Sequence, residues 1–127
     1  MEGTNFELVG DFMEACDQQV LSSPTFPDCN IQELRISLIE EEFKELLEGI
    51  FREDIVEVAD ALTDLLYVVY GAGHSFGIDL DACFAEVHRS NMTKLGPDGR
   101  AIKRGDGKIM KSENYSPPDL ESILKGA

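Results

Sequence analysis

Apolar residues recur at helical spacing in four stretches of the chain, which predict helices over about residues 5–20, 31–50, 52–75 and 79–93. The segment between the first two contains two prolines and predicts a loop, with Phe26 as its buried anchor. Two turn sequences after residue 94, Pro97-Asp98-Gly99 and Asp106-Gly107, predict a small hairpin, and a short helix is expected over residues 120–124. The pattern therefore predicts an all-α protein of four to five helices with a short C-terminal hairpin.

The predicted helix over residues 31–50 has an acidic face and an apolar face. Glu41, Glu45 and Glu48 fall on one side, with Glu42 at its edge, and a wide apolar stripe occupies the other side. Taken alone, this is an amphipathic helix whose acidic face is solvated. Leu34 and Leu38 also lie on the acidic side, however, which indicates that this side is covered as well.

The next predicted helix carries acids in apolar surroundings. Glu57, Asp60 and Asp64 follow one another at i, i+3 and i+7, and the rest of the helix is apolar nearly all round, as in a buried helix. Carboxylates in such surroundings cost several kcal/mol each unless a cation or good hydrogen bonds compensate them. No Lys or Arg stands between Arg52 and Arg89. Carboxylate oxygens without Cys or clustered His favour Mg²⁺, Mn²⁺ or Ca²⁺, so the two helices predict one oxygen-lined metal site.

Composition limits the remaining classes of function. The 127 residues suit a single domain, and a hydrophobic content of 43% excludes a disordered polyanion. The net charge of −14 argues against binding to nucleic acid or an anionic membrane. Three widely spaced cysteines predict free thiols in a reducing compartment, and no signal peptide or membrane span is evident, so we expect a cytoplasmic protein.

Basic residues gather after the helices. Six of the 11 Lys and Arg residues lie between Lys94 and Lys111, which divides the single domain into a core over residues 5–94 and a basic tail over residues 95–127. Carboxylates, a divalent ion and a basic segment together suggest a phosphate-bearing substrate. The residues themselves thus favour metal-dependent hydrolysis of a phosphoanhydride, in which a spare carboxylate activates water.

The acids also form a recognisable motif. Glu41-Glu42-x-x-Glu45 followed by Glu57-x-x-Asp60 resembles the EExxE…ExxD signature of the all-α nucleoside triphosphate pyrophosphohydrolases. The likeness runs over about residues 6–120 and is nearest to the small MazG-like, phosphoribosyl-ATP pyrophosphohydrolase-like group. Three segments carry it beyond the acids: EVADALTDLLYVVYG, EVHRSNMTKLGPDG and DGKIMKSENYSPPDL. The resemblance implies an intertwined homodimer or a tetramer, with a helical bundle shared between subunits.

The resemblance also assigns roles to individual residues. It implies cleavage between the α- and β-phosphates, with Mg²⁺ as cofactor and Mn²⁺ as a substitute. The implied metal ligands are Glu41, Glu42, Glu45, Glu57 and Asp60, and either Glu41 or Glu42 is expected to activate the water. Asp64 is expected to be a further ligand or a sugar contact. The other implied substrate contacts are Asn91 and Lys94, followed by Arg89, Lys108, Lys111 and Tyr115.

Three readings of the function stay open. The first is a house-cleaning enzyme for a nucleotide such as dUTP or dCTP, and the second is an activity like that of phosphoribosyl-ATP pyrophosphohydrolase. The third is a non-catalytic acidic helical module that binds a partner or a metal. The first helix departs from the group near Met13 and Gln18, where His and Gly are frequent, so base preference is not predicted.

Overall fold

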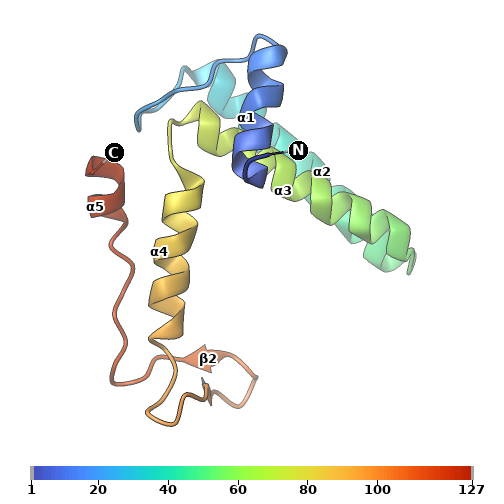
Figure 1. Ribbon diagram of the computed structural model, residues 1–127. Coiled ribbons are helices and arrows are strands. Elements are labelled where there is room, and N and C mark those ends of the chain that lie inside the picture. The colour runs from blue at the N-terminus through green and yellow to red at the C-terminus, as the bar shows by residue number, and fades with distance from the viewer. Residues whose placement is uncertain (1, 127) are drawn as a thin grey trace. The chain divides into compact units, whose positions relative to one another are not determined.

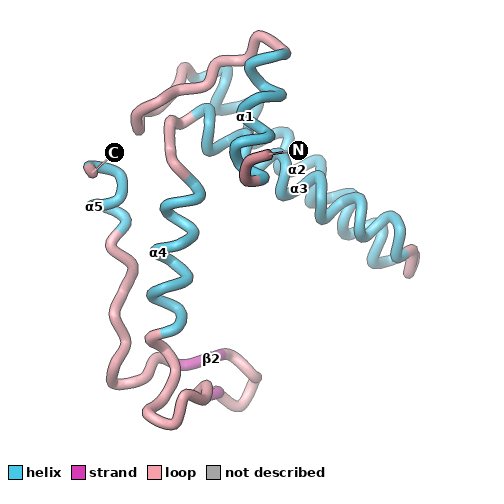
Figure 2. Tube along the Cα trace, in the orientation of Figure 1, coloured by secondary structure: helices cyan, strands magenta, loops and turns pink. Residues whose placement is uncertain are grey.

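The computed structural model of the protein describes residues 2–126, and these form an all-α fold (Figures 1 and 2). The predicted fold class is therefore confirmed. The described elements, in chain order, are α1 (Asn5–Ala15), α2 (Cys29–Phe51), α3 (Ile55–Ser75), α4 (Leu80–Met92), β1 (Ile102–Lys103), β2 (Ile109–Met110) and α5 (Leu120–Lys125).

The chain divides into two compact units. The N-terminal unit extends to Leu80 and contains α1, α2 and α3, and the C-terminal unit starts at Asp81. Most of α4 therefore groups with the hairpin and α5, whereas the sequence pattern placed it with the core. Each unit is described below by itself.

Helices α2 and α3 form an antiparallel hairpin joined by a very short turn. Helix α2 ends at Phe51, Glu53 adopts a left-handed φ of 53°, and the Asp54 side chain accepts from the backbone N–H groups of Val56 and Glu57 to start α3. Gly49 lies in the last turn of α2. A Cβ there would come within 3.1 Å of the Val58 nitrogen, so the glycine permits close approach of the two helices.

Helix α1 packs on α3 and is shorter than predicted. Thr4 and Glu7 form a capping box at its start. The helix stops at Ala15 rather than near residue 20, because Asp17 takes a left-handed φ of 59° and the Gln18 N–H donates to the Met13 carbonyl at 2.8 Å. At its other end the Phe6 ring stacks on His74 with centroids 3.8 Å apart.

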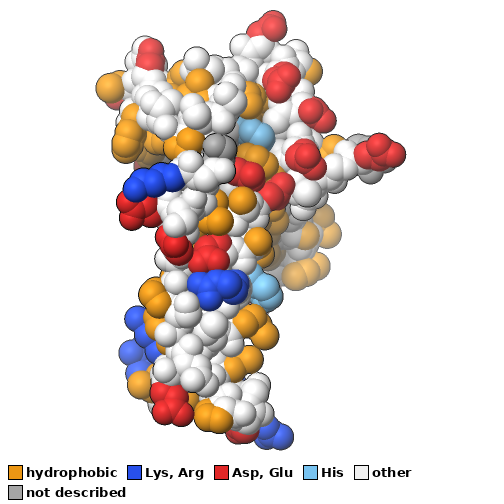
Figure 3. Space-filling model, turned by 60° about the vertical axis from the view of Figure 1, so that its left-hand side comes forward, with side chains coloured by type: hydrophobic (Ala, Val, Ile, Leu, Met, Phe, Trp, Pro, Cys, Tyr) orange, Lys and Arg blue, Asp and Glu red, His pale blue; other side chains and the backbone are white. Residues whose placement is uncertain are grey.

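The buried core of the N-terminal unit is small for so many apolar residues. The buried hydrophobic side chains among its described residues are Phe6, Val9, Met13 and Ala61. Helix α3 was expected to be buried all round. In the single chain it is not, because α1 and α2, the described helices that pack most extensively on it, leave part of its surface open. Ile55 and Val56 are 77% and 75% exposed, and Phe26 is 81% exposed rather than buried, with only an edge contact to Phe76. Figure 3 shows apolar side chains lying open among acidic ones.

The C-terminal unit is held together by hydrogen bonds from the tail to α4. The Ser112 hydroxyl donates to the Thr93 carbonyl, and the Ser90 hydroxyl donates to the Ser116 carbonyl, each at 2.8 Å. The two predicted hairpin strands are present and antiparallel, with Ile102 opposite Met110. None of the described helices is both long enough and apolar enough to cross a bilayer.

Candidate metal centre

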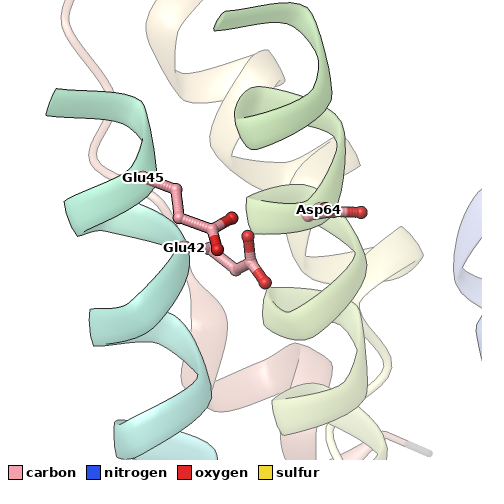
Figure 4. Close-up of side chains that lie close together, drawn as sticks. All are labelled: Glu42, Glu45 and Asp64. Atoms are coloured by element: carbon pink, nitrogen blue, oxygen red, sulfur yellow. The ribbon is translucent and has the colours of Figure 1, made fainter. Parts of the chain in front are cut away.

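Three carboxylates converge where α2 faces α3. One ligand oxygen each from Glu42, Glu45 and Asp64 lies within 4.8 Å of the others. Figure 4 shows Glu42 and Glu45 extending from α2 toward α3, on which Asp64 lies. The spacing explains the arrangement, since residues three apart share one face of a helix and the short turn brings the middle of α3 alongside. The result is an oxygen cluster contributed by two helices.

The cluster carries more negative charge than its surroundings compensate. The pKa of Glu42 is raised to about 7, first by burial, then by a hydrogen bond with Glu45 and by the charges of Glu45, Asp64 and Asp60. Burial and the charges of Asp60 and Glu45 raise the pKa of Asp64 as well. Two carboxylates share a hydrogen bond only when one of them is protonated, so Glu42 retains a proton to about neutral pH when no cation is present.

The donor atoms suit a hard divalent cation. The Oε2 atom of Glu42 is buried and has no hydrogen-bond partner within the described chain. Within residues 2–126, the ion pairs do not include any member of the cluster. A buried oxygen without a donor is costly, and a cation placed among the three carboxylates would satisfy it. Carboxylate oxygens without sulfur or imidazole fit Mg²⁺ or Mn²⁺.

The other expected ligands lie at different distances from this cluster. Asp60 is exposed, yet it is close enough for its charge to raise the pKa of both Glu42 and Asp64. Glu57 is half-buried one turn before Asp60, in the first turn of α3, and packs on Gly49. Glu41 is exposed on α2 and is not part of the converging set. The converging set therefore consists of Glu42, Glu45 and Asp64, and Glu41 and Glu57 lie outside it.

Apart from Asp64, the expected substrate contacts belong to the C-terminal unit. Several are already engaged there: Arg89 donates to Glu86 at 2.7 Å and to Ser116, and the Lys111 ammonium lies 4.7 Å from the centre of the Tyr115 ring. The remaining members of the set are the exposed Asn91, the half-buried Lys94 and the exposed Lys108.

One polar residue of the N-terminal unit was missed at the sequence level. Arg35 is only 6% exposed, and its Nε donates to the Ser75 hydroxyl at 2.9 Å. The available signal was its position two helical turns before Glu42, on the same face of α2. In the sequence of an amphipathic helix, a single arginine cannot be told apart from an ordinary charged residue on the surface.

Known proteins resemble this chain over its helical part. The family model of phosphoribosyl-ATP pyrophosphohydrolase matches residues 9–91. An uncharacterised protein of Acanthamoeba polyphaga mimivirus is 40% identical over 85 residues, which are 63% of this chain and 34% of the relative. The match thus spans about a third of that relative's length. A crystal structure from Exiguobacterium sp. 255-15, provisionally assigned as an NTP pyrophosphohydrolase, is 25% identical with a TM-score of 0.48, covering 99% of this chain and 94% of that one.

Proposed function

The chain belongs to the phosphoribosyl-ATP pyrophosphohydrolase family, and we propose that it is a metal-dependent nucleoside triphosphate pyrophosphohydrolase. It would cleave between the α- and β-phosphates and release a nucleoside monophosphate and pyrophosphate. The observation that supports this most is the cluster of Glu42, Glu45 and Asp64, with one buried carboxylate oxygen lacking a donor. A divalent cation would satisfy these oxygens, and such a cation also binds phosphate oxygens.

The roles of the protein residues follow from their placement. Glu42, Glu45 and Asp64 would hold Mg²⁺, or Mn²⁺ in its place, with Asp60 and Glu57 as the next carboxylates along α3. When bound, the cation would neutralise charge on the phosphate oxygens. A water oxygen bonds to phosphorus as the bridging P–O bond breaks, and the water proton passes to Glu41 or Glu42. Glu41 is exposed and outside the converging set, which leaves it free to meet that water.

The substrate is proposed as a deoxynucleotide such as dUTP or dCTP. A second candidate is phosphoribosyl-ATP, which the name of the matching family favours. Both carry the same phosphoanhydride, so the carboxylates would serve either one. In both cases Asn91, Lys94 and Arg89 are proposed to contact the substrate, together with Lys108, Lys111 and Tyr115.

We also propose a homodimer, or a tetramer built from such dimers. Helices α2 and α3 expose large apolar side chains in the single chain, among them Phe43, Leu47 and Leu66 at 50%, 51% and 55%. Open apolar surface of this extent is typical of an interaction face, and a second copy would cover it. Light scattering should give at least twice the chain mass of 14.1 kDa. A fully active monomer would contradict this proposal.

The proposed compartment is the cytoplasm. Cys16 and Cys29 are exposed thiols without a disulfide partner within the described residues, and Cys83 is buried. Exposed thiols are stable in a reducing compartment.

The function is tested by measuring pyrophosphate release from a panel of nucleotides that includes dUTP, dCTP and phosphoribosyl-ATP. We expect release with Mg²⁺ or Mn²⁺ and none with EDTA, and restoration when the cation is added back. Metal-independent release of phosphate, or no turnover of any nucleotide at micromolar enzyme, would instead favour a non-catalytic acidic module.

A further inference from the structure

A buried guanidinium without an acidic partner lies in the N-terminal unit. Arg35 is 6% exposed, and its hydrogen-bond partners are neutral: the Ser75 hydroxyl at 2.9 Å, the Gln18 Oε1 at 3.4 Å and the Met13 sulfur at 3.9 Å. The ion pairs found within residues 2–126 do not involve it. A buried charge without a counter-charge is costly, so a protein with 25 acidic residues would be expected to supply one if the role of Arg35 were only structural.

The guanidinium borders a pocket of about 130 Å³ between α1, α2 and α3. Phe12 and Tyr67 line it, and their rings meet edge to face with centroids 5.8 Å apart. Leu38 and Val68 supply further apolar lining. A cavity of roughly 150 Å³ is known to hold a benzene molecule, and this pocket is slightly smaller, so it would receive one edge of a flat ring rather than a whole base. Aromatic and aliphatic walls suit a planar, uncharged ligand.

The pocket lies on the same helix seam as the carboxylates. Arg35 precedes Glu42 by two turns of α2, about 10 Å along the helix axis. On α3, Gly71 follows Asp64 by two turns, and a Cβ at Gly71 would come within 2.6 Å of the Arg35 Nη1 atom. The metal centre and the pocket therefore lie about two helical turns apart along the contact between α2 and α3.

Hydrogen-bond donors predominate at the polar end of the pocket. The Arg35 guanidinium has no acceptor atom, and the Gln18 side chain, whose carbonyl oxygen accepts from Arg35, adds an NH₂ donor. A ring with a carbonyl oxygen on its inserted edge would accept from these donors. A ring with an amino group there would place donor against donor. Phosphate fits the aromatic walls poorly.

We propose that this pocket binds the base of the nucleotide, and that Arg35 and Gln18 select bases that present a carbonyl oxygen over bases that present an amino group. This inference rests on the proposed function, because it assumes that the phosphates of the same nucleotide bind at the cluster of Glu42, Glu45 and Asp64. Arg35 and Gln18 are specificity residues in this scheme, and they touch the base rather than the reacting phosphate.

The test compares nucleotides that differ mainly in that one group. The kcat/KM of dITP is set against that of dATP, and the kcat/KM of dUTP against that of dCTP. We expect the carbonyl-bearing member to be favoured at least about tenfold in the pair whose ring size fits, since unpaired polar groups in a site reject the wrong analogue strongly. Arg35→Met, of similar shape and without donors, should bring that ratio close to one. Arg104→Met removes an exposed arginine of the hairpin turn and should leave the ratio unchanged.

Further measurements separate the possible failures. Gln18 is exposed, so Gln18→Leu should fold and should lower the ratio even if Arg35→Met does not fold. Turnover with equal kcat/KM within both pairs would overturn the selection while leaving the proposed reaction intact. If no nucleotide is turned over, calorimetry with dIMP and dAMP decides: tighter binding of dIMP, lost in Gln18→Leu, supports the pocket, and equal or absent binding overturns it.

Discussion

The two units of the chain treat their acidic side chains in opposite ways. In the C-terminal unit, carboxylates pair with nearby cations: Glu86 with Arg89, Asp106 with Arg104, and Glu121 with Lys125, at 2.6–2.7 Å. In the N-terminal unit, Glu42, Glu45 and Asp64 face one another across α2 and α3. The pairing partners in the first case are neighbours within four residues, whereas Glu42, Glu45 and Asp64 form no ion pair within residues 2–126, although Lys44 lies close to two of them in the sequence. Charge that a sequence leaves uncompensated in one place, and pairs elsewhere, indicates where an external cation belongs.

The pKa values follow this division. The hydrogen bonds from Arg89 and from the Asp119 backbone lower the pKa of Glu86 to about 2, whereas burial and neighbouring acids raise that of Glu42 to about 7. The same residue type is therefore stabilised as an anion in one unit and as a neutral acid in the other.

The largest expected effect comes from removing a ligand oxygen. Glu45→Gln or Asp60→Asn keeps the shape of the side chain and removes its charge, so pyrophosphate release should fall by at least about a hundredfold. Helical circular dichroism should persist. Glu121→Gln is the matched control, because Glu121 is exposed and paired with Lys125, and it should retain full activity. Full activity in both Glu45→Gln and Asp60→Asn would remove these residues from the site.

The next largest effect should be that of pH on the stability of the metal-free protein. The pKa of Glu42 is about 7 when folded and 4.5 in the ordinary state, so the folded protein holds this proton more tightly than the unfolded chain. The contribution is fully present below pH 4.5 and is lost as pH rises through about 7. Thermal unfolding of the metal-free protein should therefore shift to lower temperature over this window.

Binding of Mg²⁺ should restore the stability that the metal-free protein loses near pH 7. Below about pH 7, binding should also displace the proton from Glu42. Calorimetry in buffers of different ionisation enthalpy measures the proton count. Glu42→Gln should remove both the pH dependence and the proton release. A wild-type curve that is flat from pH 4.5 to 7 would contradict the coupling between Glu42 and its acidic neighbours.

Close helix packing offers a smaller and purely structural test. At Gly71 an added Cβ would come within 2.6 Å of the Arg35 guanidinium, so Gly71→Ala should lower the free energy of unfolding by about 1–3 kcal/mol. Gly105→Ala adds the same methyl group with nothing within 4 Å and should change stability by less than about 0.5 kcal/mol. Urea titration of both variants measures the difference. Equal effects would show that the α2–α3 contact tolerates the methyl group.

The smallest effect is expected in the C-terminal unit. Arg89→Met removes the hydrogen bonds that lower the pKa of Glu86, which should rise from about 2 toward 4.5. Because the folded pKa is lowered, the stabilisation is present above the ordinary pKa and is lost as pH falls toward 2. Carboxyl NMR shifts of Glu86 report this directly. An unchanged titration would assign the lowered pKa to the Asp119 backbone alone.

The sequence predicted the helices well and the packing less well. Periodicity located α2 and α3, two turn sequences located the β-hairpin, and the i, i+3, i+7 spacing singled out Asp64 on α3. The early stop of α1 was missed, because a left-handed residue at Asp17 has no strong sequence signal. The exposure of α3 was missed for another reason, since an all-apolar helix indicates that something covers it without indicating what. Arg35 could not be interpreted because burial of a lone charge depends on three helices that meet only in the fold.

The brevity of the connection between Phe51 and Ile55 has a consequence for how this protein can change. A residue deleted from α2 between Glu45 and Gly49 would rotate the part of α2 before it by about 100° relative to α3. The carboxylates on α2 and the guanidinium would then both lose their counterparts on α3. The short connection therefore ties both groups to one register between the two helices.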